Sequence, residues 1–229
     1  MIKRASALVS ERTARAEPAG AIPTLRAYSR SIPKAIVIGA STGGPEALTT
    51  LLQSLQPCTI PVPIFIVLHM PADFSTMVAA YLERMSGRPT STAIHGFAPI
   101  PGHIYIAPAG RHLRLHGRAS RAVMHLDDGD SENFCKPAVD VLFRSAAASF
   151  GSSLLAIVLT GTGQDGLDGS RAIVEAGGNV IVQDQATSAA WGMPGAVAGN
   201  GYASAILSIE VMGLKVASLF RSSVVERAG

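Results

Sequence analysis

The sequence has 229 residues, of which 48% are hydrophobic and 15% charged, enough for one sizeable domain with a real core. Apolar runs stay well short of the ~18 residues of a membrane span, and the N-terminus carries no apolar signal segment. Cys58 and Cys135 lie far apart and form no CxxC pair, and two lone thiols favour a reducing compartment over a disulfide framework. We therefore expect a cytoplasmic protein without membrane insertion.

The net charge of +3 is unevenly distributed along the chain. Residues 1–34 hold seven Lys/Arg and two acids, or +5, whereas the remainder holds twelve basic and fourteen acidic residues, or −2. The basic residues are scattered and lack interleaved aromatic side chains, so we expect no nucleic-acid binding. We interpret residues 1–34 as a flexible basic arm or linker, 35–222 as the folded domain and 223–229 as a C-terminal tail.

Strand and helix patterns alternate along the domain. The first part of the domain should form a strand over 35–38, a helix over 45–55, a strand over 63–68 and a helix over 73–85 with Asp73 as N-cap. Short strands should follow over 103–107, 112–115 and 122–126. The last part should form a helix over 137–150, a strand over 154–159, a helix over 167–176, strands over 179–183 and 202–207, and a helix over 209–220. This alternation predicts an α/β fold: a doubly wound, mainly parallel sheet with helices on both faces. The turn-rich section 91–126 suggests a small antiparallel excursion.

Three polar residues follow predicted strands of this sheet. Ser41 comes after the first strand, His69 after the second, and Asp165 in the loop after strand 154–159. In open α/β sheets, ligands bind outside the carboxyl ends of the strands. A hydroxyl, an imidazole and a carboxylate at one such edge predict a Ser-His-Asp catalytic site.

The turn after the first strand, Gly39-Ala40-Ser41-Thr42-Gly43, matches the G-x-S-x-G nucleophile elbow. It places a hydroxyl at a helix N-terminus, where backbone N–H groups can stabilise an oxyanion. A structural or anion-binding turn fits the same residues. Both phosphate-loop patterns fail, because Ser41 occupies the second glycine position of G-x-G-x-x-G and Pro45-Glu46 replaces the Lys and hydroxyl of the P-loop.

His69 and Asp165 each allow a structural interpretation as well. A histidine at a strand end is often a satisfied structural residue, and Asp165 or Asp168 could cap the helix that follows. The other histidines show neither H-x-x-x-H spacing nor cysteine partners, and the acidic loop 127–132 lacks the EF-hand pattern. We therefore expect no metal.

Several sequence blocks together resemble the chemotaxis protein-glutamate methylesterases, the CheB family, in the family's order over residues 35–222. They are Ile36-Val-Ile-Gly-Ala-Ser-Thr-Gly-Gly-Pro45, Leu68-His-Met-Pro71, His103-Ile-Tyr-Ile-Ala-Pro108, Pro137-Ala-Val-Asp-Val-Leu-Phe-Arg-Ser145, Leu159-Thr-Gly-Thr-Gly-Gln-Asp-Gly166 and Trp191-Gly-Met-Pro194. The resemblance implies Ser41 as nucleophile, His69 as base and Asp165 as the residue that orients the histidine, with no metal and no organic cofactor. We also place Thr42, Thr162 and Met193 on the oxyanion or substrate side.

The resemblance further implies the substrate and the pathway. The family hydrolyses glutamate methyl esters on methyl-accepting chemotaxis receptors, releases methanol, and in many members deamidates receptor glutamines. We expect a monomer acting in two-component signal transduction; an esterase for another signalling protein and a non-catalytic receptor-binding module are the alternatives. Three departures stand out. Only 34 residues precede the domain where the family usually carries a receiver domain, as in a stand-alone form or a fragment. Thr162 replaces a common methionine, and Ala138 replaces a frequent serine.

Overall fold

The structure is a computed structural model that describes residues 23–71 and 74–225, with side chains described up to residue 220. Its main sheet is parallel throughout, in the order β3 (Thr90–Thr92), β4 (Ile104–Ile106), β2 (Ile64–Leu68), β1 (Ala35–Ala40), β7 (Leu154–Val158), β8 (Asn179–Gln183) and β9 (Ala205–Leu207). Strands β5 (His112–His116) and β6 (Val123–Asp127) form a separate antiparallel pair. The predicted fold class is confirmed.

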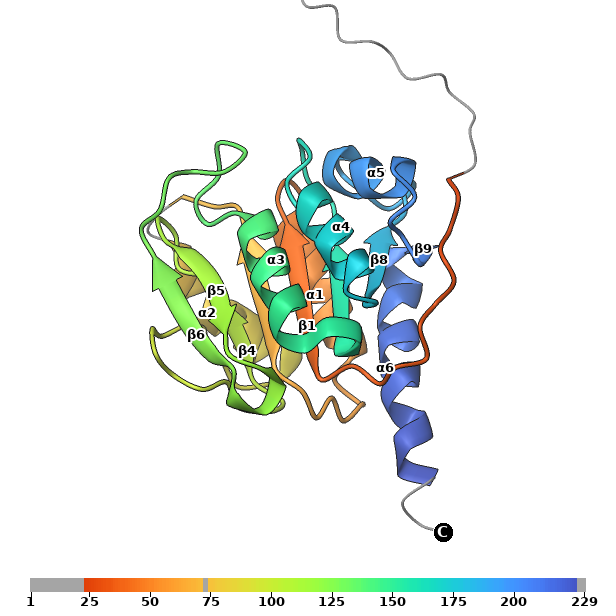
Figure 1. Ribbon diagram of the computed structural model, residues 1–229, viewed down its shortest axis with the longest axis horizontal. Coiled ribbons are helices and arrows are strands. Elements are labelled where there is room, and N and C mark those ends of the chain that lie inside the picture. Colours follow the sequence, from red (N-terminus) through yellow and green to blue (C-terminus); the bar gives the residue numbers. More distant parts are fainter. Residues whose placement is uncertain (1–22, 72–73, 226–229) are drawn as a thin grey trace, which may run out of the picture.

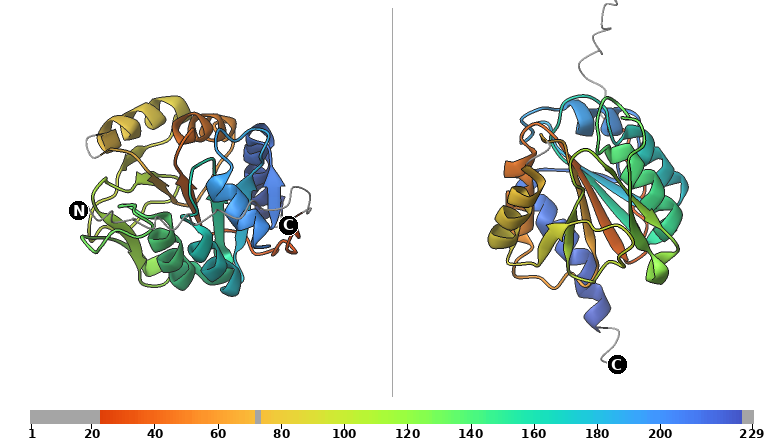
Figure 2. Two further views of the ribbon diagram at one scale, coloured as in Figure 1. Left: turned by 90° about the horizontal axis from the view of Figure 1, so that it is seen from above. Right: turned by 90° about the vertical axis from the view of Figure 1, so that its left-hand side faces the viewer.

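Helices cover both faces of the main sheet (Figures 1 and 2). One face carries α1 (Gly44–Ser54), α2 (Ser75–Ser86) and α6 (Ile209–Val225), and the other carries α3 (Val139–Phe150), α4 (Leu167–Glu175), α5 (Gly192–Gly199) and the β5–β6 pair. Short 3-10 turns lie at Ala119–Arg121 and Gly151–Ser153. Within the described ranges, every helix is too short or too polar to cross a bilayer.

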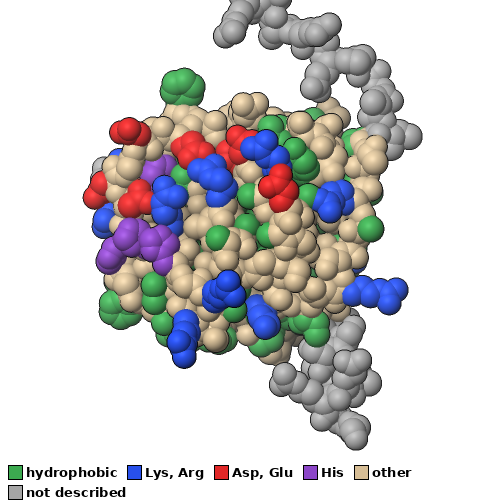
Figure 3. Space-filling view, viewed as in Figure 1, with side chains coloured by type: hydrophobic (Ala, Val, Ile, Leu, Met, Phe, Trp, Pro, Cys, Tyr) green, Lys and Arg blue, Asp and Glu red, His purple; other side chains and the backbone are tan. Residues whose placement is uncertain are grey.

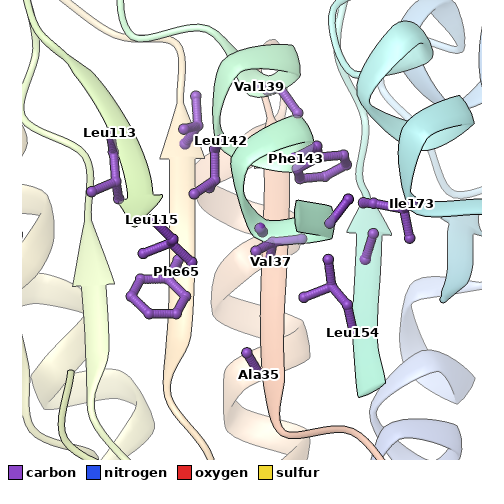
Figure 4. Packing of buried hydrophobic residues seen from close by; sticks show 14 of the residues in the cluster. Ala35, Val37, Phe65, Leu113, Leu115, Val139, Leu142, Phe143, Leu154 and Ile173 are labelled. Carbon is purple, nitrogen blue, oxygen red and sulfur yellow. The ribbon is translucent and has the colours of Figure 1, made fainter. Parts of the chain in front are cut away.

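The central strands are buried on both sides. Side chains of β1 alternate, so Val37 belongs to the core beneath α3 whereas Ile36 belongs to the core beneath α1. Figure 4 shows Val37 and Leu154 below Phe143 of helix α3. Burial on two faces explains why these strands read as continuous apolar runs in the sequence.

The order of strands changes direction at the centre of the sheet. After β1 the chain builds β2, β4 and β3 on one side, and it then returns to build β7, β8 and β9 on the other. Such a switch point is where open α/β sheets bind ligands. The turn from β1 into α1 lies at this switch point. Gly43 in that turn has a left-handed φ of 76°, which glycine tolerates because it has no side chain to clash.

The turn-rich section is less antiparallel than predicted. The strand expected over 103–107 is β4, which pairs in parallel with β2 and with β3, a strand the sequence did not indicate. Both are three residues long, too short to carry a periodic signal. Helix α5 was also missed, because its sequence is rich in Gly and contains a Pro. The predicted N-cap Asp73 lies outside the described residues.

The expected domain boundaries shift at both ends. Residues 23–34 lie against the body of the domain: Arg26 N–H donates to Ala203 O (2.9 Å), and the amide of Asn179 exchanges two hydrogen bonds with the Ser29 backbone (2.8 and 2.9 Å). Tyr28 packs on the core beneath the Lys215 ammonium, 4.6 Å from its ring centroid. At the other end α6 continues to Val225, past the expected start of the tail. Residues 1–22 and 226–229 are not described.

Candidate active site

The strand order brings the three predicted residues to one rim of the sheet. Strand β1 lies between β2 and β7 in the sheet. Ser41 comes directly after β1, His69 comes directly after β2, and Asp165 lies in the loop after β7. His69 N–H donates to Ala40 O and Ser41 N–H donates to Thr160 O, both at 3.0 Å. The backbone therefore ties the start of the Ser41 turn to both neighbouring strands.

His69 and Asp165 form a direct side-chain contact. The Nε2 atom of His69 lies 2.9 Å from Oδ2 of Asp165, and the two side chains are only 15% and 3% exposed. An ionised carboxylate can only accept, so Nε2 carries the proton and Nδ1 is left as an acceptor. A neutral imidazole held in one tautomer by a buried carboxylate is what a general base of a serine hydrolase requires.

Asp165 also caps a helix. Its Oδ2 accepts Val139 N–H (2.6 Å) and its Oδ1 accepts Asp140 N–H (3.0 Å), both in the first turn of α3, whose N-cap Ala138 offers no side-chain acceptor. Burial raises the pKa of Asp165, but the hydrogen bonds from His69 and from these two N–H groups outweigh it and lower the pKa below its usual range. Asp165 thus both contacts His69 and caps a helix, and the capped helix is α3, not the following α4.

A second buried carboxylate lies beside Asp165. Asp140 accepts Gly169 N–H of α4 (2.6 Å), and the side-chain amide of Asn133 donates to both Asp140 (2.8 Å) and Asp165 (3.2 Å). Burial and then the charge of Asp165 raise the pKa of Asp140 to about 6. The Asn133 amide therefore bridges two carboxylates of very different basicity.

Cys135 occupies the other side of the imidazole. Its Sγ lies 3.6 Å from Nδ1 of His69, and burial together with the nearby Asp165 raises the pKa of the thiol. His69, Cys135 and Asp165 thereby bring three atoms of metal-ligand type within 4.8 Å of one another. Sequence spacing gave no sign of this contact, because 66 residues of chain separate His69 from Cys135.

The Ser41 hydroxyl has no hydrogen-bond partner among the residues that the structure describes. Its Cβ packs over Gly161, where an added Cβ would lie 2.8 Å from Ser41 Cβ and overlap the sulfur of Met193. The backbone N–H groups of Thr42 and Gly43, next to the start of α1, likewise meet no described acceptor. An uncommitted hydroxyl beside uncommitted N–H donors can attack a carbonyl and hold the resulting oxyanion.

Thr160, to which the sequence assigned no role, fastens the turn below Ser41. Its hydroxyl donates to Thr42 O (2.9 Å) and accepts Ala190 N–H (2.9 Å), and the side chain is buried. One buried hydroxyl therefore joins the loops after β1, β7 and β8. A threonine at a strand end gives no local signal for such contacts, which join residues 30 and 118 positions apart.

The remaining predicted residues divide into two groups. Thr42 and Thr162 are exposed, with their hydroxyl oxygens 3.5 Å apart, so both are accessible to a substrate approaching Ser41. Met193 was expected on the substrate side, but its side chain is fully buried against Gly161. Its position in α5, below the loop after β7, makes it a support for that loop.

The neighbouring cavity does not enclose the serine. A cavity of about 540 Å³ opens beside the turn and is lined by Gly43, Thr160 and Gln183 among others, but not by Ser41. Ser41 is itself only partly buried. An open position at the rim suits a group presented on the surface of a macromolecule better than a small molecule enclosed in a pocket.

The fold and these side chains define the chain as a doubly wound α/β domain with a candidate hydrolase site at the switch point of its sheet. Residues 36–216 match the CheB methylesterase family, and the chain belongs to that family.

Two named relatives are protein-glutamate methylesterase/protein-glutamine glutaminases. The protein of Nitrobacter hamburgensis is 47% identical, in a match that covers 89% of this chain and 53% of the relative. The group 2 operon protein of Rhodopseudomonas palustris is 46% identical, in a match that covers 89% of this chain and 54% of the relative. The crystal structure of the Thermotoga maritima CheB methylesterase catalytic domain is 36% identical, with a TM-score of 0.78 over 82% of this chain and 98% of that one. The chain thus spans about half the length of the curated relatives and nearly all of a catalytic domain.

Proposed function

We propose that the chain is a protein-glutamate methylesterase that acts in the cytoplasm on methyl-accepting chemotaxis receptors, as part of a two-component pathway. The observation that carries the proposal is the His69–Asp165 pair, with a 2.9 Å contact, beside an uncommitted hydroxyl at the sheet's switch point. Family membership and the printed names of the relatives support the same reaction.

In the first half-reaction, Ser41 Oγ attacks the γ-ester carbonyl of a receptor glutamate while His69 Nδ1 takes the hydroxyl proton. Nδ1 is the ring nitrogen that can accept, because Nε2–H is donated to Asp165, and its contact in the structure is Cys135 Sγ at 3.6 Å. The buried carboxylate stabilises the imidazolium that forms. Collapse of the tetrahedral intermediate breaks the bond to the methoxy group, which leaves as methanol with the proton from His69.

In the second half-reaction, His69 takes a proton from water, whose oxygen attacks the acyl-enzyme, and returns that proton to Ser41. Each tetrahedral intermediate places its oxyanion beside the N–H groups of Thr42 and Gly43 at the start of α1. Thr42 and Thr162, both exposed beside the turn, can contact the substrate backbone.

A receptor glutamine fits the same mechanism, with ammonia as the leaving group, and the curated relatives carry the glutaminase name. We propose this second activity for the same three residues. The partly exposed serine favours a side chain presented on a folded receptor surface, which a monomer of this chain can approach.

The test is methanol release from methylated receptor by the purified full chain. Ser41→Ala removes the nucleophile and should reduce the rate by at least roughly a thousandfold. Ser218→Ala is the matched control, because it removes an exposed serine hydroxyl of α6 that bonds only Lys215 O, and it should leave the rate unchanged. Wild-type methanol release by the Ser41 variant would overturn the proposal.

A further inference from the structure

We propose that His69 and Cys135 form a binding site for a thiophilic divalent cation such as Zn²⁺, and that occupation of this site switches the candidate active site off. The proposed loss of activity rests on the proposed function, whereas the binding of the cation does not. The site is formed by residues on two segments of the fold: His69 after β2, and Cys135 in the loop between β6 and α3.

The separation of the two ligand atoms suits a tetrahedral ion. Zinc binds thiolate sulfur at about 2.3 Å and imidazole nitrogen at about 2.0–2.1 Å, which places two ligands of a tetrahedron about 3.6 Å apart. The Sγ atom of Cys135 lies 3.6 Å from Nδ1 of His69. The distance between the two ligand atoms therefore already matches that of a coordinated pair.

The second nitrogen of the imidazole is already held as metal sites require. Metal-ligating histidines almost always donate the other ring N–H to a carboxylate or carbonyl, which fixes the tautomer and makes the ligating nitrogen more basic. His69 Nε2 contacts Asp165 at 2.9 Å, and two backbone N–H groups of α3 hold that carboxylate in place. Asp165 thus serves as the supporting carboxylate and need not leave its cap to bind the metal.

The donor set determines which ions bind. Thiolate and imidazole favour Zn²⁺ and related soft or borderline ions, whereas Mg²⁺ and Ca²⁺ prefer oxygen ligands. On binding, the Cys135 thiol gives its proton to solvent and the sulfur forms the metal bond. Water molecules complete the coordination, because the protein supplies only two direct ligands.

The lone pair on Nδ1 of His69 that would bind the ion is also the one needed for catalysis, so occupation of the site should inhibit the enzyme. Nδ1 is the atom that accepts the serine proton in the proposed mechanism, and a metal on Nδ1 removes that capacity. The substrate carbonyl then meets Ser41 without a base. Binding of the ion and general-base catalysis are therefore mutually exclusive at this imidazole.

Binding can be measured without any activity. The untagged full chain is titrated with Co²⁺, which gives a thiolate charge-transfer absorption band when a cysteine binds it, and the Co²⁺ is then displaced with Zn²⁺. We expect one equivalent and a thiolate band for the wild type and for Cys58→Ala, which removes the cysteine that precedes β2 at the opposite end of that strand. Cys135→Ala should lose the band and weaken Zn²⁺ binding at least about tenfold.

A surface site must be distinguished from this one. Histidine side chains gather beside strands β5 and β6 (Figure 3), where the rings of His116 and His125 stack at 4.5 Å. His125→Ala should leave the thiolate band and the Zn²⁺ affinity unchanged. Loss of the ion in this variant but not in Cys135→Ala would overturn the proposal.

Methanol release completes the test. Zn²⁺ should inhibit the wild type reversibly, with recovery on chelation, and Cys135→Ala should need at least about tenfold more Zn²⁺ for the same inhibition. Cobalt binding by a chain without esterase activity would sink the proposed function and leave the metal site standing. An active chain without the thiolate band, or one equally inhibited with and without Cys135, would sink the metal site alone.

Discussion

Asp165 and Asp140 together link the N-termini of α3 and α4 through hydrogen bonds from backbone N–H groups. Asp165, in the loop before α4, caps the first turn of α3, and Asp140, in the first turn of α3, accepts Gly169 N–H of α4. The two helices are thus tied together at their N-termini by carboxylates, and one of these carboxylates also holds His69. The candidate active site and the packing of α3 on α4 depend on the same buried atoms.

Asp165→Asn should reduce both stability and activity. The amide keeps one acceptor oxygen but places an NH₂ group against one of the donors, His69 Nε2–H, Val139 N–H or Asp140 N–H. Loss of a helix cap typically costs about 0.5–2 kcal/mol, and loss of a hydrogen bond to a charged group about 1.5–3 kcal/mol. We expect a lower free energy of unfolding by about 2 kcal/mol or more in urea titrations, and kcat for methanol release lower by roughly 10³–10⁴-fold.

Asp168→Asn is the matched control for this variant. Asp168 lies close by in the first turn of α4, but it is 60% exposed and its ion pair with Arg171 is at the surface. Removing such a pair should change the free energy of unfolding by less than about 1 kcal/mol and leave kcat intact. Equal losses in the two variants would contradict the assignment of Asp165.

The Asp140 carboxyl predicts a specific dependence of stability on pH. Its pKa in the folded chain is raised to about 6 from 3.8, so folding favours the protonated form. The stabilisation is present at low pH and is lost as the pH rises through about 6. Asp165 has the opposite sign: its pKa is lowered, so its contribution is present above its ordinary pKa and is lost as the pH falls below it.

Asp140→Asn isolates the first contribution. The free energy of unfolding of the wild type minus that of the variant, from urea titrations at several pH values between about 5 and 7, should decrease as the pH rises. Groups that titrate independently of Asp140 cancel in this difference, and Asp165, whose pKa is lowered, stays ionised across the range. A difference that stays constant across the range would show that Asp140 ionises normally in the folded chain.

Sequence patterns found the strands and the residues that follow them, because burial on two faces and the turn glycines leave strong local signals. They could not find Asn133, Asp140 or Cys135. Asn133 and Cys135 lie in an irregular loop and Asp140 on a helix, and each acts only through contacts with distant segments. For the same reason the sequence could not tell which helix Asp165 caps: that depends on α3 packing next to the loop after β7.

Gly161→Ala should displace Ser41, the proposed nucleophile. The added Cβ would lie 2.8 Å from Ser41 Cβ and overlap the sulfur of Met193 in α5. Overpacking of this kind costs about 1–3 kcal/mol, and any shift of Ser41 also lowers kcat. In Gly199→Ala, the control at the end of α5, the new methyl meets nothing within 4 Å, so stability should be unchanged or slightly higher. Thermal unfolding and methanol release measured on both variants distinguish contact at Ser41 from a general effect of replacing glycine.

Thr160→Val tests whether one buried hydroxyl holds the Ser41 turn in place. Valine keeps the shape of the side chain but leaves Ala190 N–H and Thr42 O without their partner. An unsatisfied buried polar group costs about 1–3 kcal/mol, and the freed turn should move Ser41 relative to His69. We therefore expect lower kcat together with a lower free energy of unfolding in the valine variant, whereas Thr160→Ser, which keeps the hydroxyl, should retain most of both. If the serine variant loses as much activity as the valine variant, the methyl group and not the hydroxyl positions the turn.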